Sequence, residues 1–257
     1  MPLAAKAAST HMQQQVIYGV RPVIEAIEAG KTIDRVYIEE NARGELVTQL
    51  RRMLKEQEIP HQILPQYRFF KVADRNKNHQ GVVAYAALVE YQEIDEVVQQ
   101  AFERGETPLV LVLDRITDVR NFGALARTAE CMGVHALLIP SKGAAAINED
   151  AIKTSAGALM KIPVCRTHNL KNALEYLHDS GLQLAAATEK GAVNCWEADF
   201  KTPLALIMGN EEEGVSPEYL KRCDTLLKVP MTGTIESLNV SVAAGMFLYE
   251  CARQRNL

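Results

Sequence analysis

The sequence is poor in cysteine and has no cluster of metal-binding side chains. Its 257 residues include five cysteines, an odd number, scattered along the chain without a CxxC pair or a His/Cys cluster. This spacing argues against a structural zinc site and against a framework of disulfide bonds. Scattered free thiols are typical of a reducing compartment, so we expect a cytoplasmic protein without a bound metal.

Long apolar runs are absent as well. No stretch reaches the roughly 20 apolar residues of a transmembrane helix, and the opening MPLAAKAASTHM lacks the apolar core of a secretory signal. We therefore expect no association with a membrane. Residues 1–15 are typical of an added tag without ordered structure, and we expect the native start near Met12.

The net charge is small but unevenly distributed. The whole chain carries −4 at pH 7. Residues 16–88 contain 11 basic and 9 acidic side chains, residues 89–106 contain 1 and 6, and residues 107–257 contain 15 and 17. Only the first of these segments is basic, and weakly, so net charge alone neither favours nor excludes a nucleic-acid partner.

Three segments of different composition divide the chain. Helical and strand-like patterns alternate over 16–89, which predicts a small α/β domain with its own core. The acidic, polar stretch 90–106 is interpreted as a linker that contains a short helix. Residues 107–257 are expected to form a second, larger α/β domain.

The second domain is predicted to contain a six-stranded parallel sheet. Its strands are LVLVLD, ALLIP, IPVCRT, QLAAAT, LALIMG and TLLKVPM, with helical patterns between most of them. LVLVLD is apolar almost throughout, as expected for a strand buried on both faces of a parallel sheet. In such sheets, ligands bind at the carboxyl ends of the strands.

Three polar, glycine-containing loops follow strands of this domain: DRITDVRNFGALARTAE, MGNEEEGVSP and VPMTGTIESLNVS. Each has an ordinary explanation, since Asn121 could cap the next helix, Arg127 could be a surface arginine and GNEEEG could be an acidic turn. Together, at three strand ends, they indicate one site. A dinucleotide-dependent dehydrogenase is not supported, because no GxGxxG follows an early strand.

The three loops contain three motifs. N-x-G-x-x-x-R runs from Asn121 to Arg127, G-N-E-x-x-G covers 209–214, and P-M-x-G-x-x-x-S-L-N-V-S covers 230–241. They resemble the motifs of the SpoU/TrmH ribose 2′-O-methyltransferases of the SPOUT superfamily. The resemblance spans 107–257 and implies an α/β-knot domain, in which the chain forms a trefoil knot.

The first domain is similar to the L30e-like RNA-binding domain of the RlmB-type members of this family, through YGVRPVIEAI and NHQGVVA. Those members methylate a guanosine ribose in 23S rRNA, so the resemblance implies this activity. Two alternatives remain open. One is a tRNA 2′-O-methyltransferase of the same family, and the other is a non-catalytic RNA-binding or ribosome assembly factor, against which the intact motifs argue.

The resemblance implies that S-adenosylmethionine binds in a bent form between the loops of the second and third motifs. Glu212 is one departure from the family, which often has glycine there, and a positive φ at this residue would be strained. Backbone groups near six residues are expected to hold the cofactor: Thr188, Gly209, Asn210, Val229, Met231 and Leu238.

Five side chains are expected to act on the ribose: Asn121, Arg127, Glu211, Ser237 and Asn239. The resemblance implies that Arg127 activates the 2′-hydroxyl. Because arginine stays protonated, we expect it to position the ribose and a phosphate and to stabilise developing negative charge. Asn121 would orient Arg127 or the substrate, and Glu211 would fix Arg127 or take part in proton removal. Ser237 and Asn239 would hold the site through hydrogen bonds.

The last helix begins with a cluster of hydroxyl and amide side chains. Ser241 is either part of the site or only the cap of this helix. The helix is apolar nearly all round, which favours a buried subunit interface over simple burial in the core. The resemblance likewise implies a homodimer through the knot domain, in which each site borrows residues from the partner.

RNA recognition is expected from the first domain. In QYRFFKVADRNKNHQG, basic residues alternate with aromatic ones, a combination that binds unpaired RNA by phosphate contacts and stacking. Phe69 and Phe70 fit a stacking surface and the domain core about equally well. The residues expected to contact RNA are Arg21, Arg68, Lys71, Arg75, Lys77 and His79.

Overall fold

The computed structural model describes residues 15–234 and 237–255, so residues 1–14 of the expected tag lie outside the described part. The chain divides into two compact units with the boundary between Leu88 and Val89. Within the described ranges, no helix has the length and apolar character needed to cross a bilayer.

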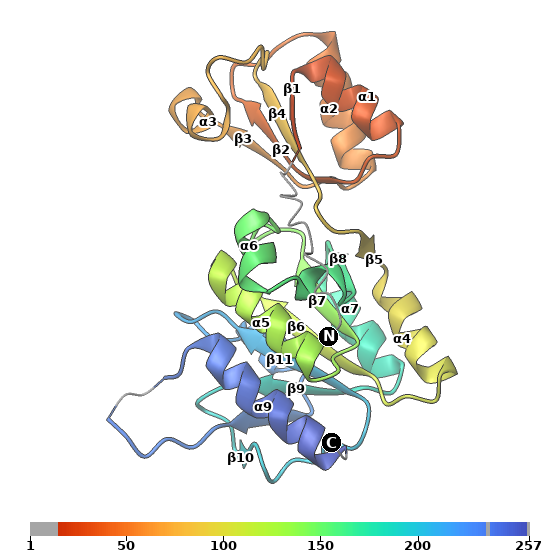
Figure 1. Ribbon diagram of the computed structural model, residues 1–257, viewed down its shortest axis with the longest axis vertical. Coiled ribbons are helices and arrows are strands. Elements are labelled where there is room, and N and C mark those ends of the chain that lie inside the picture. The colour runs from red at the N-terminus through yellow and green to blue at the C-terminus, as the bar shows by residue number, and fades with distance from the viewer. Residues whose placement is uncertain (1–14, 235–236, 256–257) are drawn as a thin grey trace, which may run out of the picture. The chain divides into compact units, whose positions relative to one another are not determined.

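The first unit is built on a mixed sheet. Its strands in the described residues are β1 (Val16–Tyr18), β2 (Ile33–Glu39), β3 (His61–Leu64) and β4 (Val82–Ala86). They lie in the order β1-β4-β2-β3 (Figure 1). β4 runs antiparallel to both of its neighbours, whereas β2 and β3 are parallel.

Alternation along β4 gives this sheet two different faces. Val82 and Ala84 pack with helices α1 (Val20–Glu28) and α2 (Glu45–Glu56). Val83, from the opposite face, packs with the shorter helix α3 (Gln66–Val72). Helix α3 lies within the basic and aromatic stretch, where the sequence analysis predicted no helix.

The second unit contains a parallel sheet, as predicted. The six predicted strands are present: β6 (Leu109–Asp114), β7 (Ala136–Pro140), β8 (Val164–Thr167), β9 (Gln183–Ala187), β11 (Leu204–Gly209) and β12 (Thr225–Lys228). Two further strands of two residues each, β5 (Tyr91–Gln92) and β10 (Val193–Asn194), extend its edges. The order over the described residues is β10-β12-β9-β11-β6-β7-β8-β5, and every pair is parallel.

Helices cover both faces of this sheet, which explains why β6 is apolar along almost its whole length and entirely buried. One face packs against α5 (Val119–Cys131), α6 (Glu149–Thr154) and α9 (Val240–Gln254). Helices α5 and α9 lie next to each other on this face (Figure 1). The other face packs against α4 (Ile94–Glu103), α7 (Leu170–Asp179) and α8 (Pro217–Leu220).

The expectation of a linker over 90–106 is wrong. Strand β5 pairs with β8, and α4 buries Val97, Val98 and Ala101 against the sheet and α7. The acidic side chains that suggested a linker lie on the outer face of an amphipathic helix, while its apolar stripe belongs to the core. The segment is therefore part of the second unit.

This packing predicts that a chain beginning at residue 89 is stable and that one beginning at residue 107 is not. The shorter chain lacks Val89, Val97 and Val98, and burial of each valine contributes roughly 1.5–3 kcal/mol. The summed loss of about 5–9 kcal/mol approaches the whole stability of a typical domain. Thermal unfolding followed by circular dichroism is the measurement. Equal midpoints for the two chains would contradict the assignment of α4 to this core.

Candidate functional site

The carboxyl ends of four adjacent parallel strands form one edge of the second sheet. These strands, β12, β9, β11 and β6, are followed by the loops that begin at Val229, Thr188, Asn210 and Arg115. Because parallel strands end at the same edge, loops that are up to about half the chain apart in sequence meet there. The second and third sequence motifs follow β11 and β12, and the first follows β6.

Three side chains from the three motifs are joined by hydrogen bonds. Asn239 Nδ2 donates to Glu211 Oε1 (2.7 Å) and to Asn121 Oδ1 (3.0 Å). Asn121 Nδ2 donates to the same Glu211 oxygen (2.8 Å). Oε2 of Glu211 has no hydrogen-bond partner among the residues that the structure describes. One carboxylate is thus fixed by two amides through one oxygen, and the other oxygen remains available to a substrate.

Two of these residues also lie at helix starts, but not as the sequence suggested. Helix α5 is capped by Asp118, whose carboxylate accepts from the backbone N–H of Asn121, so the Asn121 amide is free for the site. Helix α9 is capped by Asn239, which accepts from Ser241 N at 3.0 Å. Ser241 is therefore not the cap, and its hydroxyl donates to the capping oxygen instead.

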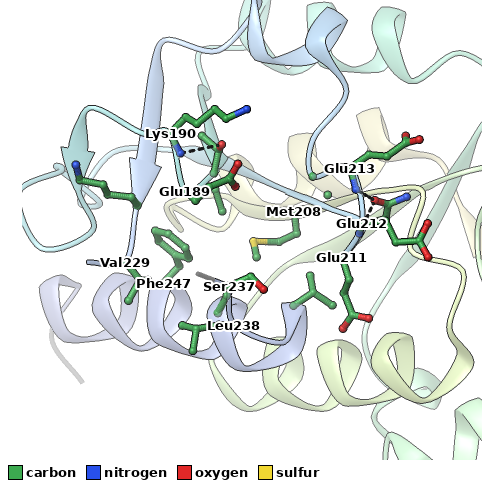
Figure 2. Close-up of a pocket in the computed structure, with 18 of the residues that line it drawn as sticks. Glu189, Lys190, Met208, Glu211, Glu212, Glu213, Val229, Ser237, Leu238 and Phe247 are labelled. Carbon is green, nitrogen blue, oxygen red and sulfur yellow. Dashed lines mark hydrogen bonds between the residues drawn. The ribbon is translucent and has the colours of Figure 1, made fainter. Parts of the chain in front are cut away.

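A pocket of about 450 Å³ lies between the loops of the second and third motifs. Figure 2 shows Met208, Ser237, Leu238 and Phe247 around this space, with charged residues of the second-motif loop and of the loop after β9 at its sides. Its volume suits a small-molecule ligand of moderate size. All six residues expected to hold the cofactor line it: Thr188, Gly209, Asn210, Val229, Met231 and Leu238.

The glycines of the first two motifs serve packing. A Cβ on Gly209 would lie 2.0 Å from the backbone carbon of Gly214, because the loop folds back over the end of β11. A Cβ on Gly123 would lie 2.9 Å from the carbonyl oxygen of Ala151, where α5 crosses α6. The close approach of the chain to itself therefore excludes a side chain at Gly209 whether or not a ligand is bound.

The 210–214 loop is held by the side chain of Asn210. Its Oδ1 accepts from the backbone N–H groups of Glu212 (3.2 Å) and Glu213 (2.7 Å), a turn that asparagine favours. Gly214 has a positive φ of 69°, whereas Glu212 does not adopt this conformation. The anticipated strain at Glu212 is therefore absent, and its side chain is exposed at the pocket.

A buried carboxylate that the sequence analysis did not assign to the site fixes the same loop. Asp114, at the end of β6, is 2% exposed and accepts from Ser216 N (2.7 Å) and Ser216 Oγ (2.6 Å). Arg115 donates to Asp114, to Glu213 and to the Gly214 carbonyl. Burial lowers the pKa of the Arg115 guanidinium, but its hydrogen bonds to Glu213 and Asp114 outweigh this and raise the pKa above its usual value. In the sequence, Asp114 is recognisable as an acidic residue at the end of an otherwise apolar strand.

Two of the predicted catalytic residues lie outside the hydrogen-bonded network. Ser237 lines the pocket, but its side chain makes no hydrogen bond within the described part of the chain. Arg127 is exposed on α5 and makes no hydrogen bond or ion pair with any residue that the structure describes. Neither Asn121 nor Glu211 is hydrogen-bonded to Arg127 among the described residues, so within one chain these bonds do not fix Arg127.

The residues expected to contact RNA lie on the first unit. Arg68 and Lys71 are on α3, Arg75, Lys77 and His79 follow it, and Arg21 is in the first turn of α1. The five cationic side chains are exposed, and His79 is partly buried.

The two neighbouring phenylalanines on α3 differ in their environments. Phe69 is fully buried and belongs to the core of the first unit, so it cannot stack on RNA. Phe70 is only partly buried and borders an open hollow on this unit. Of these two phenylalanines, only Phe70 can therefore stack on a base.

No group of three or more His, Cys, Asp or Glu side chains that could hold a metal ion occurs among the described residues.

Two family models match the chain. The model described as the SpoU rRNA Methylase family matches residues 108–249, which contain all three motifs. The model described as RNA 2′-O ribose methyltransferase substrate binding matches residues 16–92. The two matches correspond to the two units of the structure and together cover most of the chain.

Similar proteins of known sequence or structure extend these matches. YacO of Bacillus subtilis, whose name places it among TrmH family tRNA/rRNA methyltransferases, is 34% identical over 95% of this chain and 97% of its own. The SpoU methyltransferase AviRb of Streptomyces viridochromogenes, solved with AdoMet, is 25% identical over 98% of this chain and 94% of its own, with a TM-score of 0.59. The TrmH/SpoU tRNA modifying enzyme of A. aeolicus is 32% identical over 62% of this chain and 84% of its own, with a TM-score of 0.54.

The double role of Asn239 can be separated by two substitutions. Asn239→Ala removes both the helix cap and the amide links, whereas Asn239→Ser keeps a good cap and removes only the links. We expect the alanine variant to have a free energy of unfolding about 0.5–2 kcal/mol below that of the serine variant, measured by urea denaturation. Ser241→Ala is the control, because Asn239 still caps the helix in it. If Ser241→Ala is instead the most destabilised of the three, the cap is wrongly assigned.

Proposed function

This chain belongs to the SpoU rRNA methylase family, and we propose that it transfers a methyl group from S-adenosylmethionine to the 2′-oxygen of a guanosine ribose in 23S rRNA. The observation that carries the proposal is the hydrogen-bonded group of Asn121, Glu211 and Asn239 beside the pocket. It joins three motifs at the edge of the sheet where parallel α/β proteins bind ligands.

The residues that line the pocket fit S-adenosylmethionine. Val229, Leu238 and Phe247 offer apolar surface for a purine ring, and Glu189 and Lys190 offer charges for an amino-acid group. Gly209 and Thr188 also line the pocket, where backbone groups can bind a ligand without a charged side chain. The binding of AdoMet to AviRb, which shares this fold over almost its full length, supports the same ligand here.

The proposed reaction requires the ribose hydroxyl to lose its proton while the new carbon–oxygen bond forms. When bound, S-adenosylmethionine would supply a methyl group activated by its positively charged sulfur, and the carbon–sulfur bond would break as the carbon–oxygen bond forms, with a neutral thioether as the leaving group. In our proposal, Glu211 accepts the proton at Oε2, while Asn121 and Asn239 hold Oε1 and fix the direction of the carboxylate. Ser237, at the pocket wall, hydrogen bonds to the ribose. Arg127 contacts the ribose and a phosphate and stabilises negative charge on the attacking oxygen.

The choice of rRNA over tRNA rests on the first unit. The substrate-binding family model covers 16–92, which is nearly all of that unit. The tRNA modifying enzyme of A. aeolicus aligns over 84% of its own length but over only 62% of this chain. Little of its chain therefore remains that could correspond to an additional RNA-binding unit. An added RNA-binding unit suits a large folded RNA, in which the methylated nucleotide must be selected from many.

Arg127 is proposed to act in the site of a partner subunit. Within its own chain it makes no hydrogen bond or ion pair with the described site residues. Helix α9, which packs against the helix that carries Arg127, exposes Val242 (50%), Met246 (42%) and Tyr249 (59%) along one stripe. Such a stripe on a helix is suited to a symmetric interface between two copies. The dimer, and the trefoil knot that the family resemblance implies, are parts of the same proposal.

The activity is testable with tritium-labelled S-adenosylmethionine and separate preparations of unmodified 23S rRNA and tRNA. We expect label in 23S rRNA, in a dinucleotide that survives alkaline hydrolysis, because a methylated 2′-oxygen cannot attack the adjacent phosphate. Nucleoside analysis should identify guanosine. Label in tRNA would establish the alternative substrate. Label recovered in mononucleotides after alkaline hydrolysis would exclude ribose methylation. RNA binding without any label would favour the non-catalytic assembly factor.

The role of Arg127 across subunits is testable by mixing inactive variants. Arg127→Ala and Glu211→Gln should each lower the rate by roughly 10²–10³. Co-expressed in equal amounts, they should regain about a quarter of the wild-type rate, because half of the dimers would have one complete composite site.

The matched control for this mixture is Asn121→Ala with Glu211→Gln. These two residues bond within one chain, so every mixed dimer has two defective sites and no rate should be regained. If the Arg127 mixture stays as inactive as this control, Arg127 does not act in the partner's site.

A further inference from the structure

An open hollow of about 550 Å³ lies on the first unit, apart from the pocket already described. It is lined by Gln66, Tyr67, Phe70, Arg75 and His79, which come from α3 and the segment that follows it. The methyl-transfer chemistry uses none of these residues, so the hollow needs its own explanation.

Planar groups dominate the wall of the hollow. The Arg75 guanidinium carbon lies 5.0 Å from the centre of the Phe70 ring, and the Phe70 and His79 rings meet edge to face at 5.7 Å. Tyr67 is 63% exposed, and the Arg68 guanidinium carbon lies 5.8 Å from the centre of its ring, so most of this large aromatic surface faces solvent. Aromatic rings and guanidinium planes are the surfaces on which proteins stack unpaired bases.

Polar groups with defined directions lie among these planes. Gly81 N donates to His79 Nδ1 at 3.0 Å, so the neutral imidazole carries its proton on Nε2 and offers a donor there. Gln66 adds both a donor and an acceptor. A nucleobase presents donors and acceptors on its edges, and these two side chains can pair with them while its faces stack.

The segment that carries His79 is held in place by the protein itself. Its backbone is fixed by hydrogen bonds from His79 N to Lys77 O (2.9 Å) and from Val82 N to His79 O (2.7 Å). Gly81 adopts a φ of 75°, and a Cβ there would lie 2.9 Å from Ala42 Cβ. The His79 ring also packs on buried Phe69 at 5.0 Å. The hollow is thus preorganised, which lowers the entropic cost of binding a ligand.

The charges around the hollow favour an RNA ligand over an apolar peptide. Arg68, Lys71 and Lys77 are exposed on the same helix and loop. The acidic residue of this stretch, Asp74, accepts the backbone N–H of Asn76. Cations around an aromatic surface suit the phosphates on either side of a base that has left its stack.

We propose that this hollow is a nucleobase pocket, which holds one unpaired base of the RNA between Tyr67 and the Phe70–Arg75 pair. The inference rests on the proposed action on RNA and adds what the first unit recognises: a base turned out of a helix, bound away from the ribose that is methylated. Lys71 and Lys77 hold the flanking phosphates, and Gln66 and His79 contact the edge of the base.

The test uses the full chain and fluorescently labelled RNA duplexes in three forms. One carries a single bulged adenosine, one carries an abasic residue at the bulge, and one is fully paired. Wild-type protein should bind the adenosine bulge roughly 5- to 100-fold more tightly than the abasic bulge, the range measured for stacking of one base. Tyr67→Ala should remove this difference, and Tyr67→Phe should keep it.

Two controls separate stacking from other effects. Tyr176→Ala removes an aromatic ring that is also exposed, though less so (38%), from the second unit and should leave the base preference unchanged. Lys77→Ala should weaken binding of all three duplexes equally and reduce the salt dependence, because it removes a phosphate contact. Since the Tyr67 side chain is mostly exposed, its replacement should not unfold the unit, which circular dichroism will check.

The proposal is overturned if wild-type protein binds the adenosine and abasic bulges equally, or if Tyr67→Ala weakens both by the same factor. Methyl transfer to 23S rRNA, measured in parallel, tells the two proposals apart. Transfer without base preference removes the nucleobase pocket alone, whereas absence of transfer to any RNA removes the function on which it rests.

Discussion

The side chain of Asn239 connects the last helix to the rest of the site. Its oxygen caps α9, and its amide nitrogen bonds Glu211, in the loop after β11, and Asn121, in the first turn of α5. The start of the helix, the direction of the carboxylate and the position of the first motif are therefore coupled. A residue that satisfies only the helix, such as serine, would leave the carboxylate without one of its two donors. This coupling explains why hydroxyl and amide groups gather at one apolar helix start.

The parallel sheet makes this coupling possible. Every strand pair in the described second unit runs in the same direction, so residues more than 100 positions apart, such as Asn121 and Asn239, meet at one edge. Below them, the Asp114 carboxylate bonds Ser216 and fixes the loop that carries Glu211. Buried layers on both faces hold the strands, and the site gains precision from this support although its own residues are exposed.

Much of this arrangement could be predicted from the sequence. Short apolar runs predict the six main strands. The three motifs are recognisable because their residues occur together in the SpoU/TrmH family. Other features could not be read. The acidic surface of α4 concealed the apolar stripe of Val97, Val98 and Ala101, because composition averages over both faces of a helix. Asn121 and Asp118 are both good cap residues, and only the backbone decides between them. Phe69 and Phe70 are neighbours in the sequence, and helical geometry alone sends one inward and leaves the other at the surface.

The extension of the second core to Val89 leaves a very short connection between the units. Ala87 N still donates to Thr32 O in the first unit, while Val89 is already packed in the core of the second, so one residue, Leu88, separates these two contacts along the chain. A long flexible linker would lower the effective concentration of one unit near the other, whereas a connection of one residue does not. In the function proposed above, this short connection keeps an RNA bound by the first unit at a high effective concentration for the second. The second unit then needs little affinity of its own for RNA, and its surface can be devoted to the reaction.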